Sequence, residues 1–155
     1  MPSRACLAAL IALAACSRGP KLPDGDVVAE LAQAKPVGAS ALDPAAVHGK
    51  PAVVLFVSPT CPYCLATLPR ALASADAHGA TLVAVFTAGK PENARGVLEH
   101  AHYHGTALVD DGSLVRRYHI THVPLAYVLD RDGIARDALE GEQEQATFDD
   151  ALAKL

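Results

Sequence analysis

The chain has 155 residues, a formal net charge of −4 and a sequence pI near 5.9. This length suits one ordinary domain with one core, and a composition of 51% hydrophobic and 19% charged residues excludes a disordered protein. The lack of a basic excess argues against nucleic acid as a partner.

The N-terminal segment has the features of an export signal. Arg4 supplies a positive charge at the start of the chain. Residues 5–15 form an apolar stretch that is too short to span a bilayer, for which ~20 residues are needed. We therefore expect this segment to be removed from the mature protein.

The end of this segment, Leu13-Ala14-Ala15-Cys16, resembles the bacterial lipobox, in which cleavage precedes a cysteine that carries lipid. By that resemblance residues 1–15 are a signal peptide and Cys16 is the lipidated N-terminus of the mature protein. Ser17 then favours sorting to the outer membrane, on the periplasmic side. The alternative is an ordinary secretory signal cut near Ala15, which leaves Cys16 as a free thiol.

Residues 16–40 are predicted to be a tether that lifts the domain off the membrane. They are rich in Gly, Pro, Lys, Asp and Ala, and three prolines at positions 20, 23 and 36 interrupt regular structure. Residues 27–34 have the composition of a short helix within this tether. The folded domain is expected over residues 41–155.

Cys61 and Cys64 lie where a predicted strand meets a predicted helix. The apolar, largely β-branched residues 52–57 indicate a strand buried on both faces, and Pro62 suits a first helical position. Free N–H groups and the helix dipole stabilise a thiolate at such an N-terminus. We therefore predict Cys61 to be the nucleophile and Cys64, one turn further, to be the buried resolving thiol.

The rest of the chain alternates between strand and helix patterns and then forms a hairpin. The stretch from 52 to 86 reads as strand, helix and parallel strand, and residues 131–133 form a tight turn between two antiparallel strands. Strands are expected over residues 52–57, 81–86, 106–109, 124–130 and 134–139, and helices over residues 42–48, 62–75, 91–103, 113–118 and 145–155.

These residues together resemble the thioredoxin superfamily, and within it the membrane-anchored periplasmic branch typified by TlpA and ResA. The resemblance runs from Val47 to the C-terminus. It rests on Ser-Pro-Thr-Cys-Pro-Tyr-Cys at 58–64, on Val123-Pro124 before the turn at 130–133, and on Gly141. It implies an α/β, thioredoxin-like fold with a central mixed β-sheet flanked by helices.

The resemblance also implies a thiol-disulfide oxidoreductase of the cell envelope. Cys61, Cys64 and Pro124 would be its catalytic residues, with Pro124 in the cis form beside the cysteines. It would need no cofactor besides the Cys61–Cys64 disulfide, and its partners would be protein thiols or disulfides and a redox partner in the membrane or periplasm. The resemblance places the following residues along the substrate groove: Thr60, Pro62, Tyr63, Val123 and Gly141.

Three departures from the family pattern leave the direction of electron flow open. Thr60 stands where the family usually has tryptophan. Leu55 stands where thioredoxins have a buried acid, so that proton transfer falls to water or to a group such as Glu140. The Pro62-Tyr63 pair is typical of glutaredoxins, and Val123 is typical of the oxidase DsbA. A reducing role, as in TlpA and ResA, is our prediction, with an oxidase or isomerase role as the alternative.

A CxxC pair also binds metals, so a second hypothesis is an envelope module that binds or delivers copper. Its ligands would be Cys61, Cys64 and one of His100, His104 or His122. Tetrahedral zinc needs further ligands, and the sequence contains no second CxxC. We therefore expect no metal site, and we expect the histidines to be solvated.

Overall fold

The computed structural model describes residues 20–38, 41–87 and 89–155. Its strands are β1 (Lys35–Pro36), β2 (Ala52–Val57), β3 (Thr81–Phe86), β4 (Thr106–Val109), β5 (Leu125–Leu129) and β6 (Ala135–Glu140). Its helices are α1 (Val27–Leu31), α2 (Pro44–Val47), α3 (Pro62–Ala77), α4 (Pro91–His100), α5 (Ser113–Arg117) and α6 (Gln145–Leu152). Each strand predicted from residue 52 onward is present, within one residue of its expected ends.

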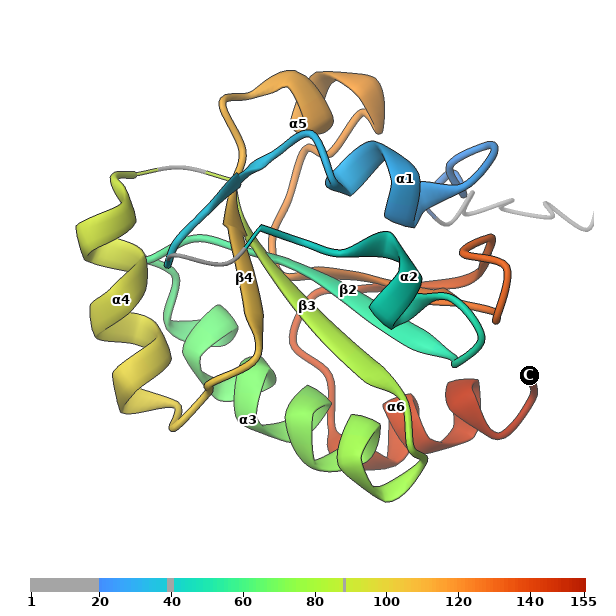
Figure 1. The fold of residues 1–155 in the computed structure, drawn as a ribbon. Helices are drawn as coiled ribbons and strands as arrows, with labels where there is room; N and C mark the ends of the chain where they lie inside the picture. Colours follow the sequence, from blue (N-terminus) through green and yellow to red (C-terminus); the bar gives the residue numbers. More distant parts are fainter. Residues whose placement is uncertain (1–19, 39–40, 88) are drawn as a thin grey trace, which may run out of the picture.

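The six strands form one mixed sheet in the order β1-β4-β3-β2-β5-β6. Strands β2, β3 and β4 are parallel, whereas β1, β5 and β6 each run antiparallel to a neighbour. Parallel neighbours need a crossover, and α3 and α4 provide the crossovers from β2 to β3 and from β3 to β4 (Figure 1). The predicted strand–helix–strand unit is therefore confirmed.

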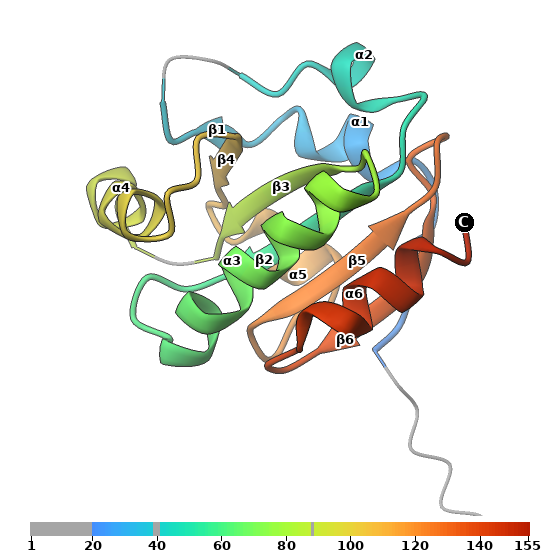
Figure 2. The same cartoon turned by 90° about the horizontal axis from the view of Figure 1, so that it is seen from below.

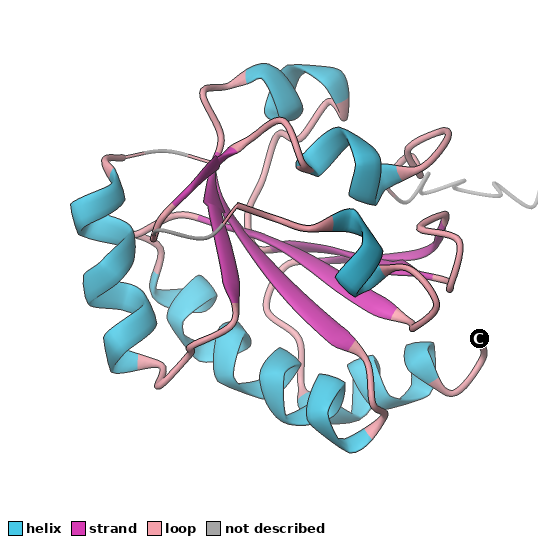
Figure 3. Cartoon of the chain, viewed as in Figure 1, coloured by secondary structure: helices cyan, strands magenta, loops and turns pink. Residues whose placement is uncertain are grey.

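Helices cover both faces of the sheet, as Figures 2 and 3 show. Helices α3, α4 and α6 pack on one face, and α1, α2 and α5 pack on the other. Since successive strand residues point to opposite faces, Val53 and Leu55 meet the first layer, and Val54 and Phe56 meet the second. All residues of β2 are buried, so the predicted central strand is confirmed.

The prediction that residues 16–40 form a tether is wrong for the part that is described, residues 20–38. Asp26 caps α1, and this helix buries Val28 and Leu31 against the sheet. Strand β1 then pairs with the edge of β4. The prolines do not prevent this, because Pro23 precedes α1 and Pro36 lies in an edge strand, where a missing N–H does little harm.

Glu30 fastens α1 to the far end of α5. Arg117 Nη2 donates to Glu30 Oε1 at 2.9 Å, and the Tyr118 hydroxyl donates to Oε2 at 2.8 Å. The hydrogen bond from Arg117, opposed by burial, lowers the pKa of Glu30. The N-terminal helix is thus held by charge as well as by apolar packing.

The C-terminal helix is shorter than predicted. It ends at Leu152 rather than at residue 155; Phe148 and Leu152 are buried, whereas Ala146 and Leu155 are exposed. The predicted signal peptide over 1–15 and the lipidated Cys16 lie outside the described residues. Within the described ranges, no helix is both long and apolar enough to cross a membrane.

Candidate active site

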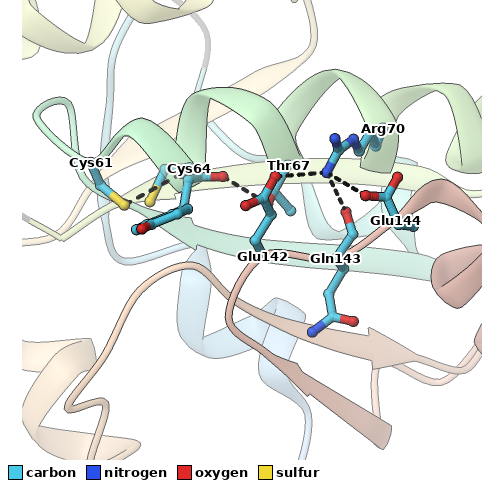
Figure 4. Close-up of polar contacts among 8 residues, drawn as sticks. Cys61, Cys64, Thr67, Arg70, Glu142, Gln143 and Glu144 are labelled. Atoms are coloured by element: carbon cyan, nitrogen blue, oxygen red, sulfur yellow. Dashed lines mark hydrogen bonds and ion pairs between the residues drawn. The ribbon is translucent and has the colours of Figure 1, made fainter.

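The end of β2 brings the two cysteines to the N-terminus of α3. Cys61 is the N-cap residue of this helix and has extended backbone angles, φ −93° and ψ 111°. Its N–H donates to the carbonyl of Ser58 at 3.2 Å, and Pro62 occupies the first helical turn, where no N–H is required. The predicted strand-to-helix corner is therefore confirmed (Figure 4).

The two sulfurs have different surroundings. The backbone N–H of Cys64 donates to Cys61 Sγ at 3.3 Å, so Cys61 lies where a helix N-terminus stabilises negative charge. Cys61 is partly exposed, whereas the Cys64 side chain is buried in the core. Burial, and then the hydrogen bond with the Cys61 thiol, raises the pKa of Cys64 from 9.0 to about 12. This asymmetry agrees with the predicted roles, in which Cys61 attacks and Cys64 resolves.

The Val123–Pro124 segment lies against Cys61. The peptide bond between these residues is cis, as predicted. In the thiol form, Cys61 donates to the carbonyl oxygen of Val123, with 3.7 Å between sulfur and oxygen. Gly141, which has φ +81°, donates its N–H to the Pro124 carbonyl at 2.8 Å. The structure thus places Cys61, Val123, Pro124 and Gly141 around one site.

The outer rim of this site is formed by residues of the β2–α3 corner. Thr60 and Pro62 are exposed, and the Tyr63 side chain is 60% exposed. Beside Val123 the surface is hollowed by a pocket of about 150 Å³. This pocket is lined by Thr87, Val115, Ile120, Thr121, His122 and Val123. The surroundings of Cys61 thus include an exposed aromatic ring at Tyr63 and, at Val123, the edge of a small pocket.

Position 55 in β2, where thioredoxins have a buried acid, is occupied by an apolar side chain. Leu55 is fully buried, and its partners in the sheet register are Ala84 and Ala126. Glu140 lies with its carboxylate 3.6 Å from His122 Nδ1, and no hydrogen bond among the described residues joins it to Cys64. A role for Glu140 in accepting the Cys64 proton therefore stays a prediction.

The histidines do not assemble a metal site with the cysteines. In the described part of the chain, no three His, Cys, Asp or Glu side chains come close enough together to hold a metal ion. His100 ends α4, His104 lines a separate pocket beside β4, and the His122 side chain is 76% exposed. No observation favours the copper hypothesis.

Arg70 is a residue near the site that the sequence reasoning missed. It projects from α3 toward the loop after β6, where it contacts Glu142, Gln143 and Glu144 (Figure 4). Arg70 and Glu142 are 72 residues apart in the sequence. No local pattern could have paired them, because the contact depends on how α3 and α6 lie together.

The comparison with protein families identifies the fold. The sequence profile of a family described as a thioredoxin-like domain matches residues 39–155, which is more than half of the chain. The chain belongs to the thioredoxin-like domain family. The predicted superfamily and the predicted α/β thioredoxin-like fold are therefore confirmed.

Relatives of this thioredoxin-like chain include proteins of thiol-disulfide exchange. A secreted disulfide oxidoreductase of Mycobacterium tuberculosis, homologous to E. coli DsbE, is 26% identical with a TM-score of 0.69, and the match covers 79% of this chain and 94% of that one. The MTB protein dsbF is 25% identical with a TM-score of 0.70, over 81% and 96% of the two chains. The expectation of an enzyme agrees with these neighbours.

A curated relative is the methylamine utilization protein MauD of Methylobacillus flagellatus. It is 29% identical over 86 residues, which are 56% of this chain and 42% of the relative. The chain thus spans less than half of the length of this relative.

Proposed function

We propose that the protein is a thiol-disulfide oxidoreductase of the cell envelope that reduces disulfides of other proteins through Cys61 and Cys64. The observation that carries this proposal is the unequal thiol pair at the N-terminus of α3. One sulfur is partly exposed and accepts a backbone N–H, and the other is buried and has a raised pKa. The similarity to the mycobacterial disulfide oxidoreductase supports the same class of reaction.

The proposed reaction has two exchange steps. The Cys61 thiolate attacks one sulfur of the substrate disulfide, and the other substrate sulfur leaves as a thiolate and takes up a proton. Cys64 then loses its proton and attacks Cys61, which releases the second substrate thiol and leaves a Cys61–Cys64 disulfide. Two electrons have passed to the substrate, and a dithiol redox partner must return them before the next cycle.

The groove residues bind the substrate in this proposal. Thr60, Pro62 and Tyr63 contact the partner on one side of Cys61, and Gly141 contacts it on the other. The backbone of Val123, held beside Cys61 by Pro124, pairs with an extended segment of the partner. Support comes from the exposure of the rim residues and from the contact between Cys61 and the Val123 carbonyl.

The reducing direction is tested by the reduction potential of the Cys61/Cys64 pair. The full-length protein is equilibrated in dithiothreitol or glutathione buffers, and the fraction of disulfide is measured. A value near that of thioredoxin, about −270 mV, supports a reductant that needs an electron donor. A value near that of a strong oxidant, about −120 mV, would mean that the protein donates disulfides instead.

The anchoring of the protein is a separate part of the proposal. We expect lipid on Cys16 and the outer membrane as the location, with the domain on the periplasmic side. The motif that supports this lies in residues 13–16. The protein should fractionate with membranes when expressed in a bacterium, and Cys16→Ser should move it to the soluble fraction. If the wild-type protein is soluble, the segment is an ordinary secretory signal.

A further inference from the structure

Arg70 binds the loop that follows β6 through one terminal nitrogen. Its Nη1 donates to Glu142 Oε1 at 2.9 Å and to the Gln143 carbonyl at 3.2 Å, and it lies 3.3 Å from Glu144 Oε1 (Figure 4). The Arg70 side chain is only 31% exposed, so these contacts are partly shielded from water. Because three consecutive residues are held, the contacts fix the path of the loop and not just one side chain.

The other end of this loop is tied to the redox site. Gly141 donates its N–H to the Pro124 carbonyl at 2.8 Å, and the Gln143 side-chain amide donates to the Glu140 carbonyl at 2.7 Å. The residue before Pro124 accepts a hydrogen bond from the Cys61 thiol. A chain of contacts therefore connects Cys61, the Val123–Pro124 segment, the loop and Arg70. Arg70 lies on α3, the helix that Cys61 caps, so the chain of contacts is closed.

We infer that Arg70 is a positioning residue that sets the distance between α3 and the Pro124–Gly141 pair. This distance is the width of the groove in which a protein substrate lies against Cys61. The inference rests on the proposed function and adds a determinant of substrate binding to it. Arg70 makes no hydrogen bond to either sulfur among the described residues, so its loss should affect only substrates that fill the groove.

The rest of the domain does not depend on Arg70. Helices α3 and α6 are joined independently by Ser74, whose hydroxyl donates to Asp149 Oδ1 at 2.6 Å, and by His78, whose Nε2 lies 3.3 Å from the same oxygen. Phe148 packs in the core on this face of the sheet. A partly exposed ion pair adds little to global stability. Loss of Arg70 should therefore release the loop without separating the helices.

The test compares Arg70→Met with the wild-type full-length protein on two disulfide probes, with dithiothreitol as the electron donor. Insulin presents a disulfide within a polypeptide, and hydroxyethyl disulfide is too small to fill the groove. We expect kcat/KM for insulin to fall about tenfold, mostly through KM, because misplacement of a binding surface is costly. The rate with hydroxyethyl disulfide and the reduction potential should stay the same. Arg70→Lys should recover part of the insulin activity, since its ammonium can pair with a loop carboxylate.

Two further variants separate positioning from general damage. Ser74→Ala removes a contact between the same two helices away from the loop, and it should leave both rates unchanged. Glu142→Gln should reproduce part of the Arg70→Met effect, and the double variant should be no worse than Arg70→Met alone, because both act through one contact. Additive effects would mean that Arg70 does not act through Glu142.

The inference is overturned if Arg70→Met reduces insulin as the wild type does, or if it loses the same factor with both probes. The failure of the proposed function looks different. In that case the wild-type protein itself exchanges with neither probe, whatever residue is present at position 70.

Discussion

The amide nitrogen of Cys64 lies 3.3 Å from the sulfur of Cys61, and the two cysteines differ in burial, since Cys61 is partly exposed and Cys64 is buried. The sulfur that receives the N–H is partly open to solvent, and the residue that donates it has its own sulfur in the core. The Cys61 sulfur therefore has a backbone N–H directed at it, whereas a thiolate on Cys64 would be formed in apolar surroundings.

This difference predicts selective alkylation. With one equivalent of iodoacetamide at neutral pH, the reduced protein should be labelled on Cys61, because Cys64 is buried and its pKa is raised to about 12. Peptide mass spectrometry after digestion identifies the labelled residue. The roles of the two cysteines would have to be exchanged if Cys64 were labelled first.

The same raised pKa predicts a loss of stability at alkaline pH in the reduced form. A thiol whose pKa is higher in the folded than in the unfolded protein stabilises the fold below the unfolded value, and this contribution is lost as pH rises from about 9 to about 12. Thermal unfolding of reduced and oxidised protein is compared across this range. The buried tyrosines titrate in both forms, so their effect cancels when the two unfolding temperatures are subtracted. The difference in unfolding temperature between oxidised and reduced protein should therefore change with pH. A constant difference would contradict the prediction.

The packing of α1 predicts that residues 20–38 contribute to the stability of the domain. Leu31 is fully buried, so Leu31→Ala should lower the free energy of unfolding by ~2–5 kcal/mol. Leu22→Ala is the control, since Leu22 is 37% exposed and its loss should cost less than ~0.5 kcal/mol. Denaturant unfolding measures both. Equal effects of the two substitutions would mean that residues 20–38 do behave as a tether.

Gly133 predicts a steric effect at the β5–β6 turn. Gly133 and Gly79 both have positive φ, at +77° and +62°, so alanine at either site should cost ~1–2 kcal/mol of backbone strain. A Cβ at Gly133 would also collide with the carboxylate of Asp26, which caps α1, whereas a Cβ at Gly79 meets nothing. Loss of a cap costs ~1 kcal/mol, so Gly133→Ala should be more destabilising than Gly79→Ala by about that amount. Equal unfolding free energies of the two variants would show that the Asp26 side chain can move aside without loss of stability.

The sequence predicted the parts of the fold that have strong local signals. The run of buried residues in β2, the proline at the start of α3 and the turn before β6 each have a recognisable pattern over a few residues. The redox pair was found for the same reason, because Cys61 and Cys64 are close in sequence and flanked by those signals.

The parts that were missed depend on contacts between distant segments. The short helix expected within residues 27–34 is present as α1, but its packing on the sheet was missed. That packing depends on the surface the helix covers and on Arg117, which is 87 residues away from Glu30. Arg70 and its loop are a similar case. Such pairs have no spacing rule, because their separation depends on the length of every intervening element.

The absence of an acid in β2 bears on the relative rates of the two exchange steps. Cys64 can free a trapped partner only after its proton has left, and the core that it joins holds Leu55, Ala84 and Ala126, none of which accepts a proton. The proton must then pass to solvent, to the sulfur that departs from the substrate or to a group outside β2. We therefore expect attack by Cys61 to be faster than release of the partner. The covalent complex should then accumulate during turnover of the wild-type protein, and an acid quench should trap it.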